Sequence, residues 1–134
     1  MIAYLLDTNV ISSFVRNPSG ILAERLAAVG PTAVAINPIV AGELYFGLEK
    51  RRDLRLRTRI ETVMAPLPVI AIEDPAGRHY GRIRADLERK GTPIGQNDLW
   101  IAAHALALDL TLVTDDMAEF RRVEGLRVEN WLRS

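Results

Sequence analysis

The sequence of 134 residues contains no cysteine. Without thiols the chain can form neither a disulfide nor a cysteine-bound zinc site, and a reducing cytoplasm is its expected location. Long apolar runs are also absent, and none approaches the ~20 residues that a membrane-spanning helix needs. The first ten residues lack the basic segment of a secretion signal, so we interpret them as a buried strand.

An excess of charge of either sign is missing as well, because 17 basic residues balance 17 acidic ones. Proteins that merely coat nucleic acid gain affinity from surplus positive charge, so a zero net charge argues against that class. It does not exclude an enzyme that gathers acids in a pocket and bases around it. The length and the ordinary share of hydrophobic residues, 49%, predict a single globular domain over residues 1–134.

Short apolar runs of β character alternate with helical patterns along the chain. We expect strands at 2–6, 32–36, 69–72, 111–114 and 126–128. We expect helices at 10–15, 21–29, 38–59, 79–90, 98–110 and 117–122, the first capped by Thr8 or Asn9. This alternation predicts an α/β fold with a parallel sheet covered by helices on both faces.

Acidic residues stand where functional groups gather in such a sheet, just past the carboxyl ends of the strands. Asp7 follows the first strand, and the pair Asp115 and Asp116 follows the strand at 111–114. Glu43 lies early on the helix after the second strand, and Asp98 begins the helix that leads to the strand at 111–114. All of them can therefore reach one edge of the sheet.

A cluster of carboxylates without basic partners favours a bound cation, because buried carboxylates repel each other and resist losing their water. Oxygen ligands with no histidine or cysteine nearby suit Mg²⁺ or Mn²⁺ rather than zinc. Such ions hold a phosphodiester and lower the pKa of an attacking water. The pattern predicts a metal-dependent nuclease with Asp7, Glu43, Asp98 and Asp116 as its catalytic acids.

Each acid also has a simpler interpretation. Asp7 can be a helix cap, Asp98 can complement a helix dipole, and Asp115 with Asp116 can form a turn. Glu43 is harder to explain in this way, since its neighbours at 40–42 and 44–46 are largely apolar. The acids are specific for a metal site only as a set.

Four segments of the chain resemble the PIN-domain ribonucleases, and specifically the VapC-type toxins of toxin–antitoxin pairs. They are YLLDTNVIS at 4–12, INPIVAGELYFG at 36–47, PIGQNDLWIAAHALAL at 93–108 and LVTDDMAEFRRVEGLRVENW at 112–131. They span nearly the whole chain in the family's order. The resemblance implies a small three-layer α/β/α sandwich around a short, mainly parallel sheet, and endoribonuclease activity with Mg²⁺ or Mn²⁺.

The resemblance also assigns roles to residues. It implies that Asp7, Glu43, Asp98 and Asp116 are metal ligands or their direct supports. Thr8, Asn9 and Thr114 match polar residues that orient those acids, and of the adjacent pair we favour Asp116 at the metal, with Asp115 in support.

Partners and substrate follow from the same resemblance. Members of the family usually form homodimers, and a cognate antitoxin protein blocks the site with a C-terminal segment. The subgroup with PIG-x-ND and GLR-x-EN-W resembles toxins that cut initiator tRNA. A basic stretch could steer RNA towards the acids, although we favour a solvated helix face as its explanation: Arg51, Arg52, Arg55 and Arg59.

Other functions fit less well. A phosphatase of the haloacid dehalogenase type needs an aspartate at the position of Asn9, and a receiver domain needs an early acidic pair and a late lysine. A PIN-like module that binds RNA or a protein without cleaving stays open as the non-enzymatic alternative. For the enzyme we predict products with 3′-hydroxyl and 5′-phosphate ends, because water is the expected nucleophile.

Overall fold

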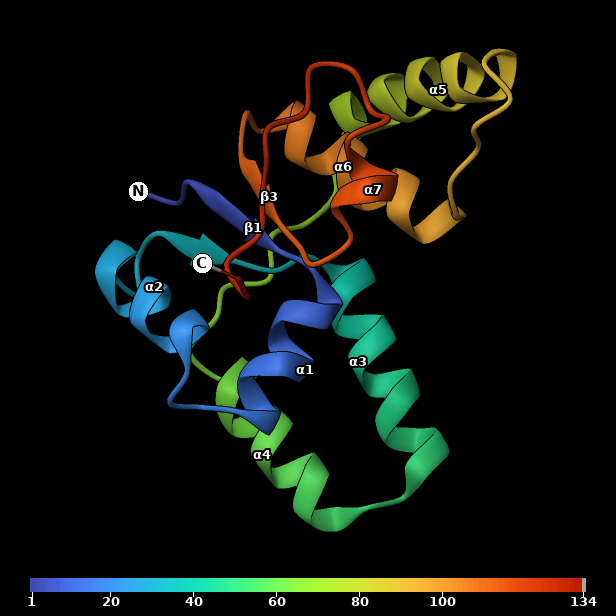
Figure 1. Cartoon of the computed structure of the whole chain (residues 1–134). Helices are drawn as coiled ribbons and strands as arrows, with labels where there is room; N and C mark the ends of the chain where they lie inside the picture. Colours follow the sequence, from blue (N-terminus) through green and yellow to red (C-terminus); the bar gives the residue numbers. More distant parts are fainter. Residues whose placement is uncertain (134) are drawn as a thin grey trace.

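The computed structural model describes residues 1–133 and consists of one sheet flanked by helices (Figure 1). The strands are β1 (Tyr4–Leu6), β2 (Val34–Ala35), β3 (Thr111–Val113) and β4 (Val128–Glu129). The helices are α1 (Thr8–Arg16), α2 (Ile21–Val29), α3 (Pro38–Arg51), α4 (Leu54–Met64), α5 (Asp74–Arg89), α6 (Gln96–Ala107) and α7 (Met117–Phe120). The predicted α/β fold with a short parallel sheet is confirmed.

The four strands are all parallel and lie in the order β2-β1-β3-β4. Leu5 of β1 pairs with Ala35 on one side and Leu112 on the other, and none of the three is exposed. Strands that are covered on both faces are apolar at consecutive positions, which is why these runs were visible in the sequence. Within residues 1–133 no helix is both long and apolar enough to cross a membrane.

The sheet brings the carboxyl ends of β1 and β3 together. The Asp7 amide donates to the carbonyl of Val113, and the Thr114 amide donates to that of Glu129. In Figure 1, α1 to α4 lie below the strands and α5 to α7 above them. Residues that follow β1 and β3 therefore stand between the two groups of helices.

The basic helix predicted to continue from residue 50 to 59 is wrong in one respect, because the structure breaks it in two. Arg52 adopts a left-handed conformation (φ 53°) that ends α3. The Asp53 carboxylate then accepts hydrogen bonds from the Arg55 and Leu56 amides and caps α4. A side chain that bonds to nearby amides in this way competes with an uninterrupted helix.

The strand predicted at 69–72 is also wrong. Only Val69 forms a bridge, parallel to Ile36, and the chain then leaves the sheet. Pro68 has no amide hydrogen to donate, and β2 is followed at once by the turn into α3 at Asn37. No partner backbone is left along which a longer strand could pair.

The predicted capping residue of α1 was likewise wrong. Neither Thr8 nor Asn9 caps the helix; Asp7 does, and its carboxylate accepts from the Thr8 amide. The last strand-like run was placed slightly early, because β4 begins at Val128.

Candidate active site

Asp7 is a buried carboxylate, 4% exposed, at the centre of the site. Its Oδ1 accepts from the Thr8 amide at 2.8 Å, and its Oδ2 accepts from the Thr114 hydroxyl at 2.7 Å and the Asn9 amide group at 3.3 Å. The Thr114 hydroxyl in turn accepts from the Asp116 amide at 3.0 Å. These bonds fix the direction of the Asp7 carboxylate and tie the end of β1 to the segment after β3.

Glu43 projects from the second turn of α3 towards the same place. One of its oxygens accepts from the Thr8 hydroxyl and the other from the side-chain amide of Asn97, at 3.4 Å. Thr8 thus connects α1 to α3, and Asn97 connects α3 to the start of α6. Val40, Leu44 and Leu48 are the buried residues of α3, whereas Tyr45 and Phe46 are exposed, so burial explains only part of the apolar sequence around Glu43.

Three further carboxylates converge beside Asp7. They are Asp98 of α6, Asp116, which caps α7, and Glu119 of α7. One oxygen of each lies within 4.8 Å of the oxygens of the other two. Glu119 Oε1 also accepts from the Gly95 amide at 3.1 Å, which fixes it against the loop that leads into α6. The structure therefore brings Asp98 and Asp116 together as the sequence predicted, and adds Glu119 to them.

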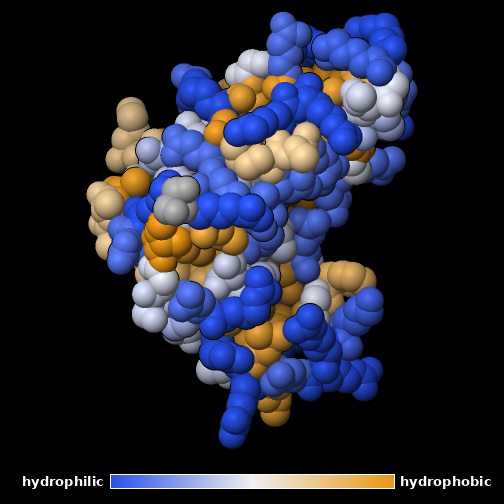
Figure 2. All heavy atoms as spheres, viewed as in Figure 1, coloured by the Kyte–Doolittle hydropathy of each residue, from blue (hydrophilic) through white to orange (hydrophobic). Residues whose placement is uncertain are grey.

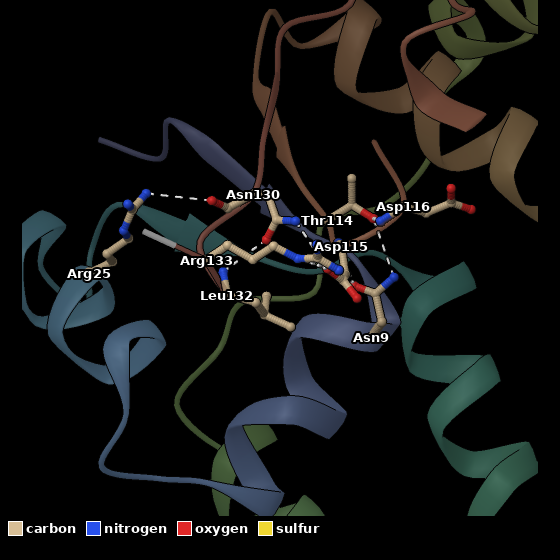
Figure 3. A network of polar contacts seen from close by, with 8 residues as sticks. All are labelled: Asn9, Arg25, Thr114, Asp115, Asp116, Asn130, Leu132 and Arg133. Carbon is tan, nitrogen blue, oxygen red and sulfur yellow. Dashed lines mark hydrogen bonds and ion pairs between the residues drawn. The ribbon is translucent and has the colours of Figure 1, made fainter. Parts of the chain in front are cut away.

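The neighbours Asp115 and Asp116 point in different directions (Figure 3). Asp115 accepts from the Asn130 side chain at 3.0 Å and lies 3.6 Å from the Arg133 guanidinium. Its amide donates to Asn9 Oδ1 at 3.0 Å. Asp115 thus connects the site to the C-terminal segment, whereas Asp116 lies among the clustered acids.

Three of the acids at the site, Asp98, Asp7 and Glu119, hold protons more tightly than free carboxylates do. Burial, the hydrogen bond with Glu119 and the charges of Glu119, Asp7 and Glu43 raise the pKa of Asp98 to about 8. Burial also raises the pKa of Asp7, against the opposing effect of the hydrogen bonds from Thr114 and Thr8. Burial and the nearby Asp116 raise the pKa of Glu119. In the absence of a cation, these groups resist being charged together.

A divalent cation fits this set of donors. All the oxygens come from carboxylates, and among residues 1–133 none of these acids forms an ion pair: Asp7, Glu43, Asp98, Asp116 and Glu119. Carboxylate oxygens are the ligands of hard cations, and such an ion would offset the burial and the repulsion that raise the pKa values of Asp7, Asp98 and Glu119. The acidic cluster can therefore hold a metal ion.

Glu119 was missed in the sequence, although a signal for it was present. Asp116 caps α7 by accepting from the Glu119 amide at 3.1 Å. An acid three residues after a capping residue is typical of a capping box, in which the second side chain turns back towards the start of the helix. The spacing of Asp116 and Glu119 could therefore have predicted that both lie at the same place.

The four arginines predicted to contact RNA differ in their surroundings. Arg51 lines a cavity that also contains Glu43. Arg52 ends α3, and its backbone conformation is the reason that the helix stops there. Arg55 and Arg59 are exposed along α4 and border a shallow depression with Leu54 and Thr58. Of the four, Arg51 is the one that lines a cavity together with an acid of the site.

The family model of the PIN domain matches residues 4–126. The chain belongs to the PIN-domain family.

Its curated relatives include VapC proteins of nearly the same length. The tRNA(fMet)-specific endonuclease VapC of Salmonella typhimurium is 36% identical, over 98% of this chain and 99% of that protein. Ribonuclease VapC2 of Haemophilus influenzae is also 36% identical, over 98% of this chain and 100% of that protein.

Solved structures resemble the fold equally closely. VapBC2 of Rickettsia felis, bound to a DNA fragment from its promoter, contains a chain that matches with a TM-score of 0.90 and 34% identity, covering 98% of this chain and 99% of that one. VapBC of Salmonella typhimurium, bound to DNA, contains a chain that matches with a TM-score of 0.90 and 36% identity, over 98% and 99% of the two chains.

Proposed function

We propose that this protein is a metal-dependent endoribonuclease that acts as the toxin of a toxin–antitoxin pair. The observation that carries the proposal is the convergence of Asp98, Asp116 and Glu119 beside the buried Asp7, with no cationic side chain of residues 1–133 paired to any of them. The relatives named as ribonucleases support RNA as the substrate.

Mg²⁺ or Mn²⁺ is the proposed ion, held by Asp98, Asp116 and Glu119 with Asp7 at their side. When bound, such an ion stabilises charge on the phosphoryl oxygens and lowers the pKa of a nearby water. Thr114 holds the Asp7 carboxylate in place, so no energy is needed to reorient it during the reaction. Glu43 faces the same region and can accept a proton from an approaching water or hydroxyl.

The printed names of the relatives suggest the substrate and partners. An initiator tRNA is the proposed target, because a relative with 36% identity is a tRNA(fMet)-specific endonuclease. A cognate antitoxin is the proposed protein partner, since the similar structures are VapBC complexes. We also propose a homodimer, and a tRNA target would place the protein in the cytoplasm.

Purified protein, freed of any antitoxin, tests this function directly. We expect cleavage of tRNA with Mg²⁺ or Mn²⁺ and none with a chelator. Asp98→Asn should abolish cleavage and relieve growth arrest, whereas Asp115→Asn is a matched control because Asp115 contacts Asn130 rather than the acid cluster. Absence of RNA cleavage with both metals, together with growth arrest that persists in Asp98→Asn, would overturn the catalytic proposal in favour of a module that only binds.

A further inference from the structure

A cavity of about 170 Å³ lies between α1, α3 and α4, and Glu43 of the candidate site lines it. Thr8 and Glu43, which are hydrogen-bonded to each other, line one part of it. Arg16 and Arg51 line another part, each eight residues further along its helix. Eight residues of an α-helix span on the order of 12 Å. The cavity thus extends from the acids to a pair of cations at the ends of α1 and α3.

The two arginines have no ion-pair partner in the part of the chain that the structure describes. Among residues 1–133, Arg16 and Arg51 form no ion pair, while Arg57 pairs with Glu49 and Arg127 with Asp109. Two exposed, unpaired guanidinium groups beside a site for phosphodiester cleavage suit the phosphates of the substrate strand. A cation in the last turn of a helix also complements the helix dipole, so the stability of arginine variants must be measured with their binding.

Gly47 leaves open space in this cavity, although the fold does not require a glycine at that position. It lies inside α3, and a Cβ added there would meet no heavy atom within 4 Å. Its φ is not positive, so neither backbone conformation nor packing demands a glycine, although glycine makes a helix less stable than alanine does. Leu44, Leu48 and Leu56 also line the cavity. Figure 2 shows apolar surface between these helices with hydrophilic side chains around it.

We propose that this cavity is a subsite for the RNA strand adjacent to the phosphate that is cleaved. Arg16 and Arg51 bind backbone phosphates, and the space above Gly47 admits a sugar or base against the apolar wall. The assignment rests on the proposed function and deepens it, because it names the side chains outside the acid cluster that position the substrate. These arginines are positioning residues and take no part in bond breaking.

Binding of a single-stranded RNA oligonucleotide in chelator, measured by fluorescence anisotropy at several salt concentrations, tests the arginines without cleavage. Each phosphate contact that is lost should lower the slope of log K against log salt by about 0.7. We expect Arg16→Gln and Arg51→Gln each to show this loss, and Arg78→Gln on α5 to leave the slope unchanged. Equal slopes in all proteins, or no RNA binding by any of them, would overturn the subsite.

Gly47→Ala tests the space itself, with Gly42→Ala as its matched control. Both glycines are in α3, and neither would clash with a Cβ, but only Gly47 lines the cavity. Both variants should unfold at the same or a higher temperature. We expect Gly47→Ala alone to raise KM for an RNA oligonucleotide several-fold with little change in kcat.

The outcomes distinguish a failure of the subsite from a failure of the proposed function. If the unsubstituted protein binds RNA but cleaves none, the proposed function fails, while the binding slopes still decide the subsite. If it cleaves RNA and Gly47→Ala matches Gly42→Ala in KM, the subsite is wrong and the function stands. If the arginine variants retain RNA binding but lose a protein partner, the cavity holds a protein segment and the RNA assignment is overturned.

Discussion

Replacing Thr114 by valine removes one hydroxyl from the centre of the site while keeping the shape of the side chain. Thr114 is fully buried, and its hydroxyl donates to Asp7 Oδ2 at 2.7 Å. The same oxygen accepts from the Asp116 amide at 3.0 Å and from Asn9 at 3.3 Å. The substitution therefore leaves a buried carboxylate and a backbone amide each with one partner fewer.

The expected cost follows from those two bonds. A hydrogen bond to a charged group contributes about 1.5–3 kcal/mol, and an unsatisfied buried donor costs about 1–3 kcal/mol. Because Asp116 is only partly buried, water can replace part of the second loss. We expect Thr114→Val to lower the free energy of unfolding by about 2–4 kcal/mol. Removing a support of this kind should lower metal affinity or activity by about 10–100-fold.

Urea unfolding and metal-dependent RNA cleavage measure the two effects. Thr114→Ser should restore most of both, because it keeps the hydroxyl. Thr111→Val is the matched control, since Thr111 begins β3 whereas Thr114 follows its end, and the Thr111 hydroxyl accepts from Arg127 at 3.3 Å rather than bonding to an acid of the site. The Thr114 bond lowers the pKa of Asp7, so Thr114→Val should also shift the pH profile of cleavage upwards. Wild-type cleavage and an unchanged pH profile in Thr114→Val would refute this reasoning.

Three further predictions concern other parts of the site and its support. Glu119→Gln should reduce cleavage by about 10–100-fold, measured at saturating Mg²⁺ and compared with a less than threefold effect of Asp115→Asn. Because the pKa of Asp98 rises from 3.8 to about 8, the metal-free protein should lose stability in urea as pH rises between these values, and Asp98→Asn should reduce that loss. Part of the loss should remain in this variant, because the pKa values of Asp7 and Glu119 are raised as well. Asn37→Ala should cost about 1–3 kcal/mol in thermal unfolding, since Asn37 caps α3 at Val40 and contacts the buried His104. The first prediction is contradicted if Glu119→Gln cleaves RNA as fast as the unsubstituted protein. The second is contradicted if the stability of Asp98→Asn depends on pH as that of the unsubstituted protein does. The third is contradicted if Asn37→Ala leaves the free energy of unfolding unchanged.

The fold could be predicted because its strands are apolar and its helices periodic. Leu5, Leu112 and their neighbours are buried on both faces of the sheet, and a continuous apolar run of this kind predicts a buried strand from sequence. The breaks could not be predicted in the same way. The end of α3 at Arg52 depends on one left-handed residue and on the Asp53 cap, which compete with a helix of nearly equal propensity.

The candidate site was accessible from sequence where the position of an acid follows from strand order. Asp7 comes directly after β1, and Asp115 and Asp116 follow shortly after the neighbouring parallel strand β3, so topology predicts that the two segments meet. Topology does not decide which of Asp115 and Asp116 faces the other acids. Glu119 requires the local geometry of α7, a helix of four residues that strand order does not specify. The cavity with Arg16 depends on how α1, α3 and α4 pack, and such packing between distant segments has no signature in any single stretch of sequence.

The ends of the RNA fragments test the central claim most directly, because they report which nucleophile attacked the phosphodiester. The account predicts that purified protein with Mg²⁺ or Mn²⁺ leaves 5′-phosphate and 3′-hydroxyl ends, and that Asp98→Asn leaves the RNA intact. Fragments that end in 2′,3′-cyclic phosphate, formed equally in chelator, would show that a ribose hydroxyl attacked and would contradict a carboxylate-bound metal as the centre of this site.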